Sequence, residues 1–321
     1  MVNNIGVVTS GGDAPGMNAA IRAVVRIAHS HKCNVLGFRR GWEGLITNTF
    51  EPLTPRSVGG IIHSGGTILH TSRCSEFRMR EGMKKAGETL SINDVDGLVV
   101  IGGNGSFNGA FELSKETDAV IMGVPASIDN DVFGTDETIG FDTAVNTAVN
   151  EIDKIRDTAV SHERVFIIEV MGRKRGFLAL TTGITVGAEV ILVPEVKYKK
   201  ENIFETLREN SAKGKKSAII VAAEGIGKTH KLAADIEEST GSEVRLSILG
   251  YAQRGGAPTA RSRLLASLFA GKAVELLLKK KEDKVVVLKR GRITSIELKK
   301  SCTIEKPLDL GLLKLAKILA I

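Results

Sequence analysis

Two aspartates that could carry out acid–base chemistry, Asp129 and Asp131, stand two residues apart in the segment PASIDND (125–131). One carboxylate of such a pair can accept the proton of a hydroxyl group, while the other helps to hold a metal ion or orients its neighbour. Aspartate and asparagine also form turns where strands end, so the segment by itself is more often a simple turn.

Two glycine-rich segments, TSGGDAPG (9–16) and IGGNGS (101–106), each follow an apolar run. Glycine lets backbone N–H groups approach an anion at the start of a helix, where the helix dipole favours negative charge. The glycines of the second segment do not have the G-x-G-x-x-G spacing of a dinucleotide site. Ordinary tight turns use the same residues. Each segment alone is therefore weak evidence for a phosphate site.

Arginines stand beside glycines in VMGRKRG (170–176) and LGYAQRGG (249–256), again after apolar runs. Arginine binds phosphate through two parallel hydrogen bonds, and the glycines permit a close approach. Because a surface arginine near a glycine is common, these segments too are weak evidence singly.

The segment AAEGIGKT (222–229) matches a relaxed P-loop pattern, in which glycine, lysine and threonine cradle nucleotide phosphates. The strict pattern begins with glycine, but Ala222 stands there, and no partner strand ends in a metal-binding aspartate. A P-loop NTPase is therefore only a remote alternative.

The elements that must position these segments are short apolar strands alternating with helices. Near-continuous apolar runs are typical of strands buried on both faces of a parallel sheet. The predicted strands are IGVVT (5–9), GLVVIGG (97–103), AVIMGVP (119–125), RVFIIEV (164–170), EVILVPE (189–195), SAIIVAAEG (217–225) and VRLSILG (244–250). Apolar residues at three- and four-residue spacing predict a helix over 140–160. This alternation predicts α/β units with a mostly parallel sheet, whose ligands lie at the carboxyl ends of the strands.

Length, charge and composition indicate which kinds of ligand and partner the protein could bind. A chain of 321 residues is long enough for two lobes. The net charge of +7 attracts anions, but aromatic residues make up only 4%, which favours small phosphate ligands over nucleic acid. There is no apolar run long enough for a membrane span and no signal-like start, so we expect a cytoplasmic protein with no membrane partner. Three cysteines lie far apart, without metal-ligand spacing.

Taken together and in this order, these segments resemble the bacterial ATP-dependent 6-phosphofructokinase family. The resemblance covers about residues 3–275. It also takes in GGTILHTSRC (65–74), TIGFDTAVNTAVNEIDKIRDTAVSHER (138–164), AEG (223–225) and QRGGAPTA (253–260). It implies ATP-dependent phosphorylation of fructose 6-phosphate to fructose 1,6-bisphosphate in glycolysis, with Mg²⁺, in a homotetrameric allosteric enzyme.

The resemblance also implies an architecture of two lobes, each a mostly parallel sheet flanked by helices, with the active site in the cleft between them. Residues 1–139, completed by about 252–305, would form the nucleotide-binding lobe. Residues 140–251, completed by about 306–321, would form the sugar-phosphate-binding lobe.

The roles of individual residues are carried over from the family pattern. Asp129 would be the base that takes the proton from the sugar 1-hydroxyl, with Asp131 and Arg173 as the other catalytic residues. Asn104 and Asp131 would hold the metal. The implied ATP contacts are Gly12, Arg73, Cys74, Gly103, Asn104, Gly105 and Ser106. The implied sugar-phosphate contacts are Ser127, Ile128, Asp129, Arg164, Met171, Gly172, Arg173, Glu224, Arg245, Tyr251 and Arg254, with Arg164 and Arg245 reaching in from a neighbouring subunit.

An effector site between subunits is implied as well, activated by a nucleoside diphosphate and inhibited by an acidic metabolite. The matching positions are Arg22, Arg26, Arg156, Gly187, Glu189, Lys213 and Lys215. Ser217 stands where the bacterial pattern commonly has histidine.

Several positions bear on the donor and on activity. Diphosphate-dependent relatives carry aspartate at the position of Gly105 and lysine at that of Ala126, so this sequence favours ATP. Asn104 replaces the aspartate of the usual GGDG, and Tyr251 replaces the histidine of the usual GHVQRGG. PASIDND replaces PGTIDND, with Ser127 keeping the hydroxyl. These departures leave an alternative, a weakly active or regulatory paralogue that binds sugar phosphate and nucleotide.

Overall fold

The computed structural model describes residues 2–279 and 282–320 and divides the chain into two compact units. The first unit comprises Met1–Thr143 and Arg254–Lys306, and the second comprises Ala144–Gln253 and Pro307–Ile321. Each unit is therefore built from two stretches of chain. Which ligand each unit binds stays a prediction.

The first unit contains a seven-stranded sheet with the order β11-β10-β5-β4-β1-β2-β3. Its strands are β1 Asn4–Thr9, β2 Asn34–Phe38, β3 Phe50–Leu53, β4 Gly97–Gly102, β5 Val120–Pro125, β10 Lys284–Lys289 and β11 Arg292–Glu297. β2, β1, β4, β5 and β10 run parallel, whereas the two edge strands are antiparallel to their neighbours. The central strands are mostly apolar, as expected for strands that helices cover on both faces.

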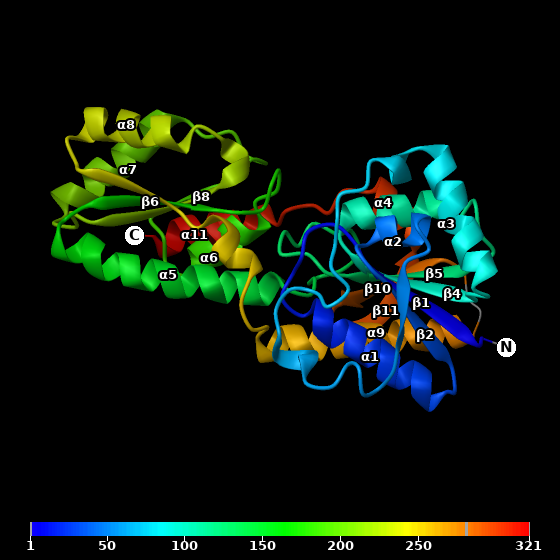
Figure 1. Cartoon of the computed structure of the whole chain (residues 1–321). Coiled ribbons are helices and arrows are strands. Elements are labelled where there is room, and N and C mark those ends of the chain that lie inside the picture. Colours follow the sequence, from blue (N-terminus) through cyan, green and yellow to red (C-terminus); the bar gives the residue numbers. More distant parts are fainter. Residues whose placement is uncertain (1, 280–281, 321) are drawn as a thin grey trace. The chain divides into compact units, whose positions relative to one another are not determined.

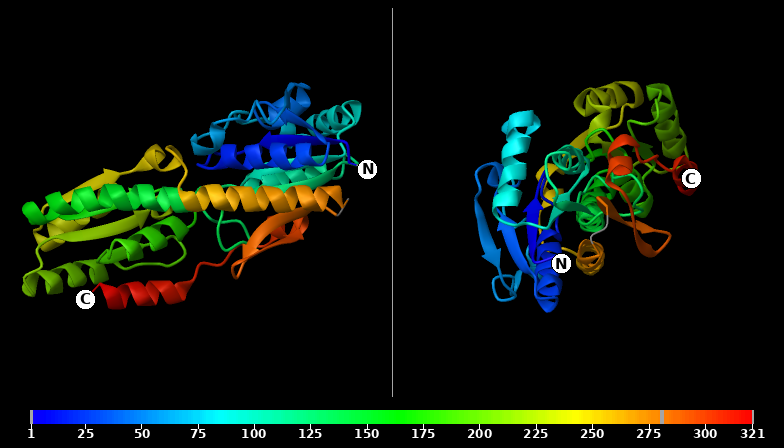
Figure 2. Two further views of the ribbon diagram at one scale, coloured as in Figure 1. Left: turned by 90° about the horizontal axis from the view of Figure 1, so that it is seen from below. Right: turned by 90° about the vertical axis from the view of Figure 1, so that its right-hand side faces the viewer.

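Helices cover this sheet on both sides (Figure 1). They are α1 Met17–Ser30, α2 Trp42–Ile46, α3 Arg80–Ile92, α4 Asn104–Leu113, α9 Ala260–Leu278 and α10 Leu298–Thr303, with short 3₁₀ helices η1 Ile61–His63 and η2 Glu76–Arg78. α1 and α9 lie side by side along one face, and α2, α3 and α4 pack on the other (Figure 2). α1 turns an apolar stripe to the sheet, with Ile21 and Val24 fully buried.

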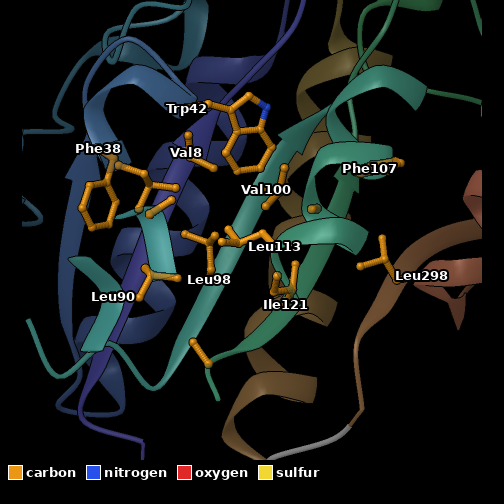
Figure 3. Packing of buried hydrophobic residues seen from close by; sticks show 14 of the residues in the cluster. Val8, Phe38, Trp42, Leu90, Leu98, Val100, Phe107, Leu113, Ile121 and Leu298 are labelled. Atoms are coloured by element: carbon orange, nitrogen blue, oxygen red, sulfur yellow. The ribbon is translucent and has the colours of Figure 1, made fainter. Parts of the chain in front are cut away.

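The core beneath α2, α3 and α4 is a cluster of buried side chains from the strands and these helices (Figure 3). The rings of Trp42 and Phe77 stack with centroids 4.3 Å apart. Leu298 of α10 reaches the same cluster and is almost fully buried. The stretch from residue 282 to residue 306 is thus an integral part of the first unit.

The second unit contains a four-stranded parallel sheet with the order β7-β8-β6-β9. Its elements are β6 Val165–Val170, β7 Val190–Leu192, β8 Ala218–Ala223, β9 Val244–Ile248, α5 Phe141–Ser161, α6 Phe177–Thr185, α7 Lys200–Ala212, α8 Thr229–Thr240, α11 Leu310–Leu319, η3 Glu224–Ile226 and η4 Gly250–Arg254. α7 and α8 cover one face of the sheet, and α6 and α11 lie on the other (Figure 1). In the described ranges, no helix is both long and apolar enough to cross a membrane.

Candidate active site

The carboxyl ends of β1, β4 and β5 bring three of the predicted segments together in the first unit. Thr9 pairs with Ile101 and Gly102 pairs with Pro125 in the parallel register. The backbone N–H of Ser10 donates to the Ile101 carbonyl at 3.1 Å. TSGGDAPG, IGGNGS and PASIDND therefore begin next to one another, as expected for the ligand-binding end of a parallel sheet.

The glycine loop after β4 leads directly into the N-terminus of α4, which begins at Asn104. A Cβ atom on Gly105 would have no neighbouring atom within 4 Å, and Gly105 is exposed. A Cβ atom on Gly103 would touch the Ser127 side chain at 3.4 Å. The loop thus abuts the aspartate segment at Gly103 and leaves open space at Gly105, where the helix dipole favours an anion.

Two polar atoms in the first turn of α4 are buried without a hydrogen-bond partner in the described part of the chain, namely Asn104 Oδ1 and Ser106 Oγ. The Asn104 amide is nevertheless oriented, because its Nδ2 donates to the Asp131 backbone carbonyl at 3.0 Å. A buried polar atom without a partner costs about 1–3 kcal/mol. Both atoms therefore fit a site whose ligand supplies the missing partner.

Residues 127–138, which we call the aspartate loop, are closed at their base by the pairing of Ala126 with Ile139. The Thr138 hydroxyl donates to the Ser127 carbonyl at 2.5 Å. The backbone N–H of Asp129 donates to the Ser127 Oγ at 3.2 Å, and the Asp129 side chain is only 5% exposed. These contacts place the predicted base in a sheltered, ordered turn.

Asn130 organises the turn between the two aspartates. Its backbone is left-handed, with a φ of 51°, a conformation that asparagine tolerates better than most residues. Its Oδ1 accepts from the Thr138 N–H at 3.0 Å, and its Nδ2 donates to the Asp136 carbonyl at 3.2 Å. The Asn130 side chain thus ties the backbone between the two aspartates to the far end of the loop.

The far end of the aspartate loop is tied to α9 by an ion pair. Arg261 donates from Nε and Nη2 to Glu137 Oε2 at 2.9 and 2.7 Å. This hydrogen bond, together with the charge of Glu137, raises the pKa of Arg261. The Arg261–Glu137 ion pair thus anchors the C-terminal end of the aspartate loop.

Arg254, predicted to clamp the sugar phosphate, lies on the first glycine loop within the first unit. Its Nη1 donates to the Asp13 carbonyl at 3.3 Å. A Cβ atom on Gly12 would approach this Nη1 to 2.1 Å, so a side chain at residue 12 would displace the guanidinium from this position. Arg254 Nε is buried with no hydrogen-bond partner among the described residues. It could donate to a bound phosphate.

The segment that ends in Arg73 and Cys74 is anchored beside the same loop. Thr71 Oγ1 donates to the Gly11 carbonyl at 2.9 Å, and Thr9 Oγ1 donates to the His70 carbonyl at 2.9 Å. Arg73 is exposed, whereas Cys74 packs against the hydrophobic cluster. Arg73 is thus the more suitable of the two for contact with a phosphate.

In the second unit, the loops after β6 and β8 meet. The Arg173 N–H donates to Glu224 Oε1 at 2.6 Å, and a Cβ atom on Gly225 would approach the Arg173 carbonyl to 2.3 Å. The Met171 N–H donates to Gln253 Oε1 at 2.9 Å. The structure therefore places the Met171–Arg173 loop against Glu224. That these residues bind the sugar stays a prediction.

Arg164 and Arg245 share one carboxylate at the edge of the same sheet. Arg164 Nε pairs with Glu243 Oε2 at 2.6 Å, and Arg245 Nη2 pairs with Glu243 Oε1. The hydrogen bond from Arg164, with further help from Arg245, lowers the pKa of Glu243. Tyr251 lies in η4 and is 82% exposed. That these residues serve a neighbouring subunit stays a prediction.

The predicted effector residues lie in both units. Arg22 and Arg26 are on α1 in the first unit. In the second unit, the buried carboxylate of Glu189 accepts from the Ile219 N–H at 2.6 Å and pairs with Lys215 at 2.6 Å. Arg156 donates to the Val186 carbonyl, beside Gly187, and Lys213 ends α7.

Sequence reasoning missed the residues that support the aspartates, namely Asn130, Thr138, Glu137 and Arg261. It also missed Gln253, which accepts a hydrogen bond from the Met171 N–H. Asn130 and Thr138 lie inside the matching segments, but their side chains act on the backbone rather than on a ligand. The buried position of Ile128 also shows that only its backbone could face a ligand. Long-range pairs such as Arg261 with Glu137 leave no local pattern in the sequence.

Known proteins resemble this chain over most or all of its length. The family model described as phosphofructokinase matches residues 4–277. A protein of Persephonella marina named ATP-dependent 6-phosphofructokinase is 50% identical over 325 residues, covering 100% of both chains. A Clostridium botulinum protein of the same name is 48% identical over 319 residues, covering 99% of this chain and 100% of the relative.

Solved structures show the same fold. The Pichia pastoris phosphofructokinase in the T-state has a TM-score of 0.89 and 34% identity over 94% of this chain. The match covers only 35% of the Pichia chain, so this chain spans about a third of it. A pyrophosphate-dependent phosphofructokinase from Marinobacter aquaeolei has a TM-score of 0.85 at 23% identity, covering 97% of this chain and 86% of that one.

Proposed function

This chain belongs to the phosphofructokinase family, and on that premise we propose that it transfers the terminal phosphoryl group of ATP to the 1-hydroxyl of fructose 6-phosphate. The observation that carries the proposal is the contact between the glycine loop and the aspartate loop in the first unit. Asn104 Nδ2 donates to the Asp131 carbonyl at 3.0 Å, and Gly103 abuts Ser127. A sheltered aspartate therefore stands beside a loop suited to nucleotide phosphates.

The family pattern assigns the chemistry to these loops and to Arg173. Asp129 takes the proton of the attacking hydroxyl, and Arg173 neutralises charge on the transferred group. Phosphoryl transfer depends mainly on positioning and charge neutralisation, which rigid loops and arginines supply. The open space at Gly105 leaves room for the additional phosphate that distinguishes ATP from diphosphate.

The site fits a magnesium ion that accompanies the nucleotide. Among the described residues there is no group of three histidine, cysteine or acidic side chains that could hold a metal by itself. Magnesium is usually held by one or two carboxylates together with substrate phosphates, which matches what is present. Asp131 and the partnerless Asn104 Oδ1 would hold it, directly or through water. The ion would neutralise charge on the phosphates.

Asn104→Asp should lower the magnesium concentration needed for half-maximal rate by a few-fold, because a carboxylate adds an anion near the metal. The same change removes the amide that donates to the Asp131 carbonyl, so thermal stability should fall by about 1 kcal/mol. Magnesium titrations of the rate and thermal melts measure the two effects. Tighter magnesium binding combined with lower thermal stability would separate the role of residue 104 in metal binding from its role in supporting the loop.

Asn104→Ala provides the matched control, since it loses the amide without gaining charge. It should destabilise the protein similarly but raise the magnesium requirement. If both variants showed the wild-type magnesium dependence, residue 104 would not belong to the environment of the metal.

The remaining residues extend the proposal to the rest of the substrate. Met171, Gly172, Arg173 and Glu224 would position the sugar from the second unit. Arg254, with Arg164 and Arg245 of a neighbouring subunit, would bind the 6-phosphate. We also propose that the protein is a cytoplasmic homotetramer with an effector site for a nucleoside diphosphate. The effector residues would be Arg22, Arg26, Arg156, Gly187, Glu189, Lys213 and Lys215.

A coupled assay of fructose 1,6-bisphosphate formation tests the function. We expect turnover with fructose 6-phosphate and ATP, and little with diphosphate. If both substrates bind but no turnover occurs at any magnesium concentration, the regulatory paralogue suggested by Asn104 and Tyr251 is correct. If diphosphate is the better donor, the interpretation of Gly105 is wrong.

Lys228→Ala should leave the KM for ATP unchanged within about twofold. Lys228 is exposed, and the loop that carries it contacts the loop after β6, where the Arg173 N–H donates to Glu224. A P-loop lysine would be needed for the phosphates of the nucleotide. Steady-state kinetics measure this, and a collapse of activity would instead support the P-loop NTPase.

A further inference from the structure

The stretch between residues 284 and 306 lies beyond the family match, which ends at residue 277, yet it holds the aspartate loop. Lys306 Nζ donates to the Asn130 carbonyl at 2.8 Å and to the Asp136 carbonyl at 3.1 Å. The ammonium group therefore bridges two carbonyls six residues apart in the loop. Hydrogen bonds from a charged donor are about twice as strong as neutral ones.

The carbonyl that Lys306 binds belongs to the residue between the two aspartates. Asn130 is 5% exposed and has a left-handed backbone, which persists only where the surroundings fix it. Its side chain is held by hydrogen bonds to the Thr138 N–H and the Asp136 carbonyl. Lys306 fixes the carbonyl. Without that bond, rotation of the peptide group after Asn130 would turn the adjoining aspartates.

The rest of the C-terminal stretch forms hydrogen bonds with the outer end of the loop. The Asp136 N–H donates to the Leu288 carbonyl at 2.7 Å, and the Leu288 N–H donates to Thr135 Oγ1 at 3.0 Å. The Arg290 N–H donates to Asp136 Oδ2 at 2.6 Å. These bonds do not involve Lys306. We therefore expect the fold and the outer loop to survive its replacement.

We propose that Lys306 is a positioning residue for phosphoryl transfer, which sets the direction of the Asp129 and Asp131 carboxylates through the backbone of Asn130. The inference rests on the proposed function, because it concerns the alignment of the base and of the metal-supporting carboxylate. We expect Lys306 to act on the chemical step more than on nucleotide affinity, because the two carbonyls that it binds belong to the aspartate loop and not to the glycine loops after β1 and β4.

Lys306→Met tests the inference, because it keeps much of the length of the side chain and removes the charge. Misplacement by about 1 Å can cost about 100-fold in rate, so kcat should fall at least about tenfold. The KM for ATP should stay within about twofold. Lys306→Arg, which can donate to both carbonyls, should recover most of the lost kcat. Lys300→Met, in the same stretch and paired with Glu297 at the surface, is the matched control and should have wild-type kcat.

The outcomes separate the inference from the proposed function. An inactive wild type would refute the function itself. An active wild type with unchanged kcat in Lys306→Met would overturn the inference. Equal losses in kcat and ATP affinity, together with a lower Tm, would overturn it as well, because they indicate a general structural role. If Lys306→Met did not fold, Lys306→Gln, which keeps one donor, would decide by the same criterion.

Discussion

Asp129→Asn should lower the turnover number by about 10²–10⁴-fold, the usual cost of removing a general base. Asparagine has the same shape, and the bond from the residue 129 N–H to Ser127 Oγ does not involve the side chain that changes. The turn should therefore keep its geometry. Affinity for ATP and fructose 6-phosphate should change little. A coupled assay measures kcat, and calorimetric titration measures the two affinities.

Asp118→Asn is a suitable control for this experiment. Asp118 is exposed and precedes β5, at the opposite end of the strand that leads to Asp129. It should retain wild-type turnover. Near-normal turnover in Asp129→Asn would remove Asp129 from the mechanism. A parallel loss in Asp118→Asn would show that charge in general, not the base, determines the rate.

The interior of the fold could be predicted because burial on both faces leaves a strong pattern. All seven predicted apolar runs are strands, and the helix predicted over 140–160 is α5 at Phe141–Ser161. The strands that were not predicted lie mostly toward the edges of the larger sheet. β3 contains a proline and β11 has an exposed face. Edge strands tolerate both features because one of their sides has no neighbouring strand, so their sequences lack a continuous apolar run. β10 carries the apolar run VVVL, so the same criterion could have found it.

The candidate site was predictable only in part, for a related reason. Parallel strands bring the ends of β1, β4 and β5 to one edge, so the position of each loop in the sequence predicts that the loops meet. The side chains that support them come from distant stretches. Arg254 lies on Gly12, and Lys306 binds Asn130. Such contacts depend on how the chain returns to the sheet, which no local spacing encodes.

The family resemblance and the structure both bear on the role of Gly105. The resemblance indicates that a side chain at this position distinguishes diphosphate from ATP as the donor. The structure adds that Gly105 lies in the first turn of α4 and faces open space. The Cβ atom of an aspartate there would have no neighbouring atom within 4 Å, and the negative charge would suit the positive end of the helix dipole. Any effect of an aspartate at this position must therefore arise from the ligand.

Gly105→Asp should accordingly raise the KM for ATP by about 30-fold or more while leaving the Tm unchanged or slightly higher. Two like charges about 4 Å apart repel by roughly 4 kcal/mol at an effective dielectric of 20, and half of that corresponds to about 30-fold in affinity. Steady-state kinetics with ATP and thermal melts measure the two quantities.

Gly105→Asn is the matched control, because asparagine has nearly the same size without the charge. If the phosphates of ATP lie at Gly105, the asparagine variant should show a smaller rise in KM, since it obstructs without repelling. The difference between the two variants should shrink as salt is added, because ions screen an exposed charge. If Gly105→Asp bound ATP as well as the wild type, the nucleotide would have to lie elsewhere. The open space at the start of α4 would then have no part in selecting the donor.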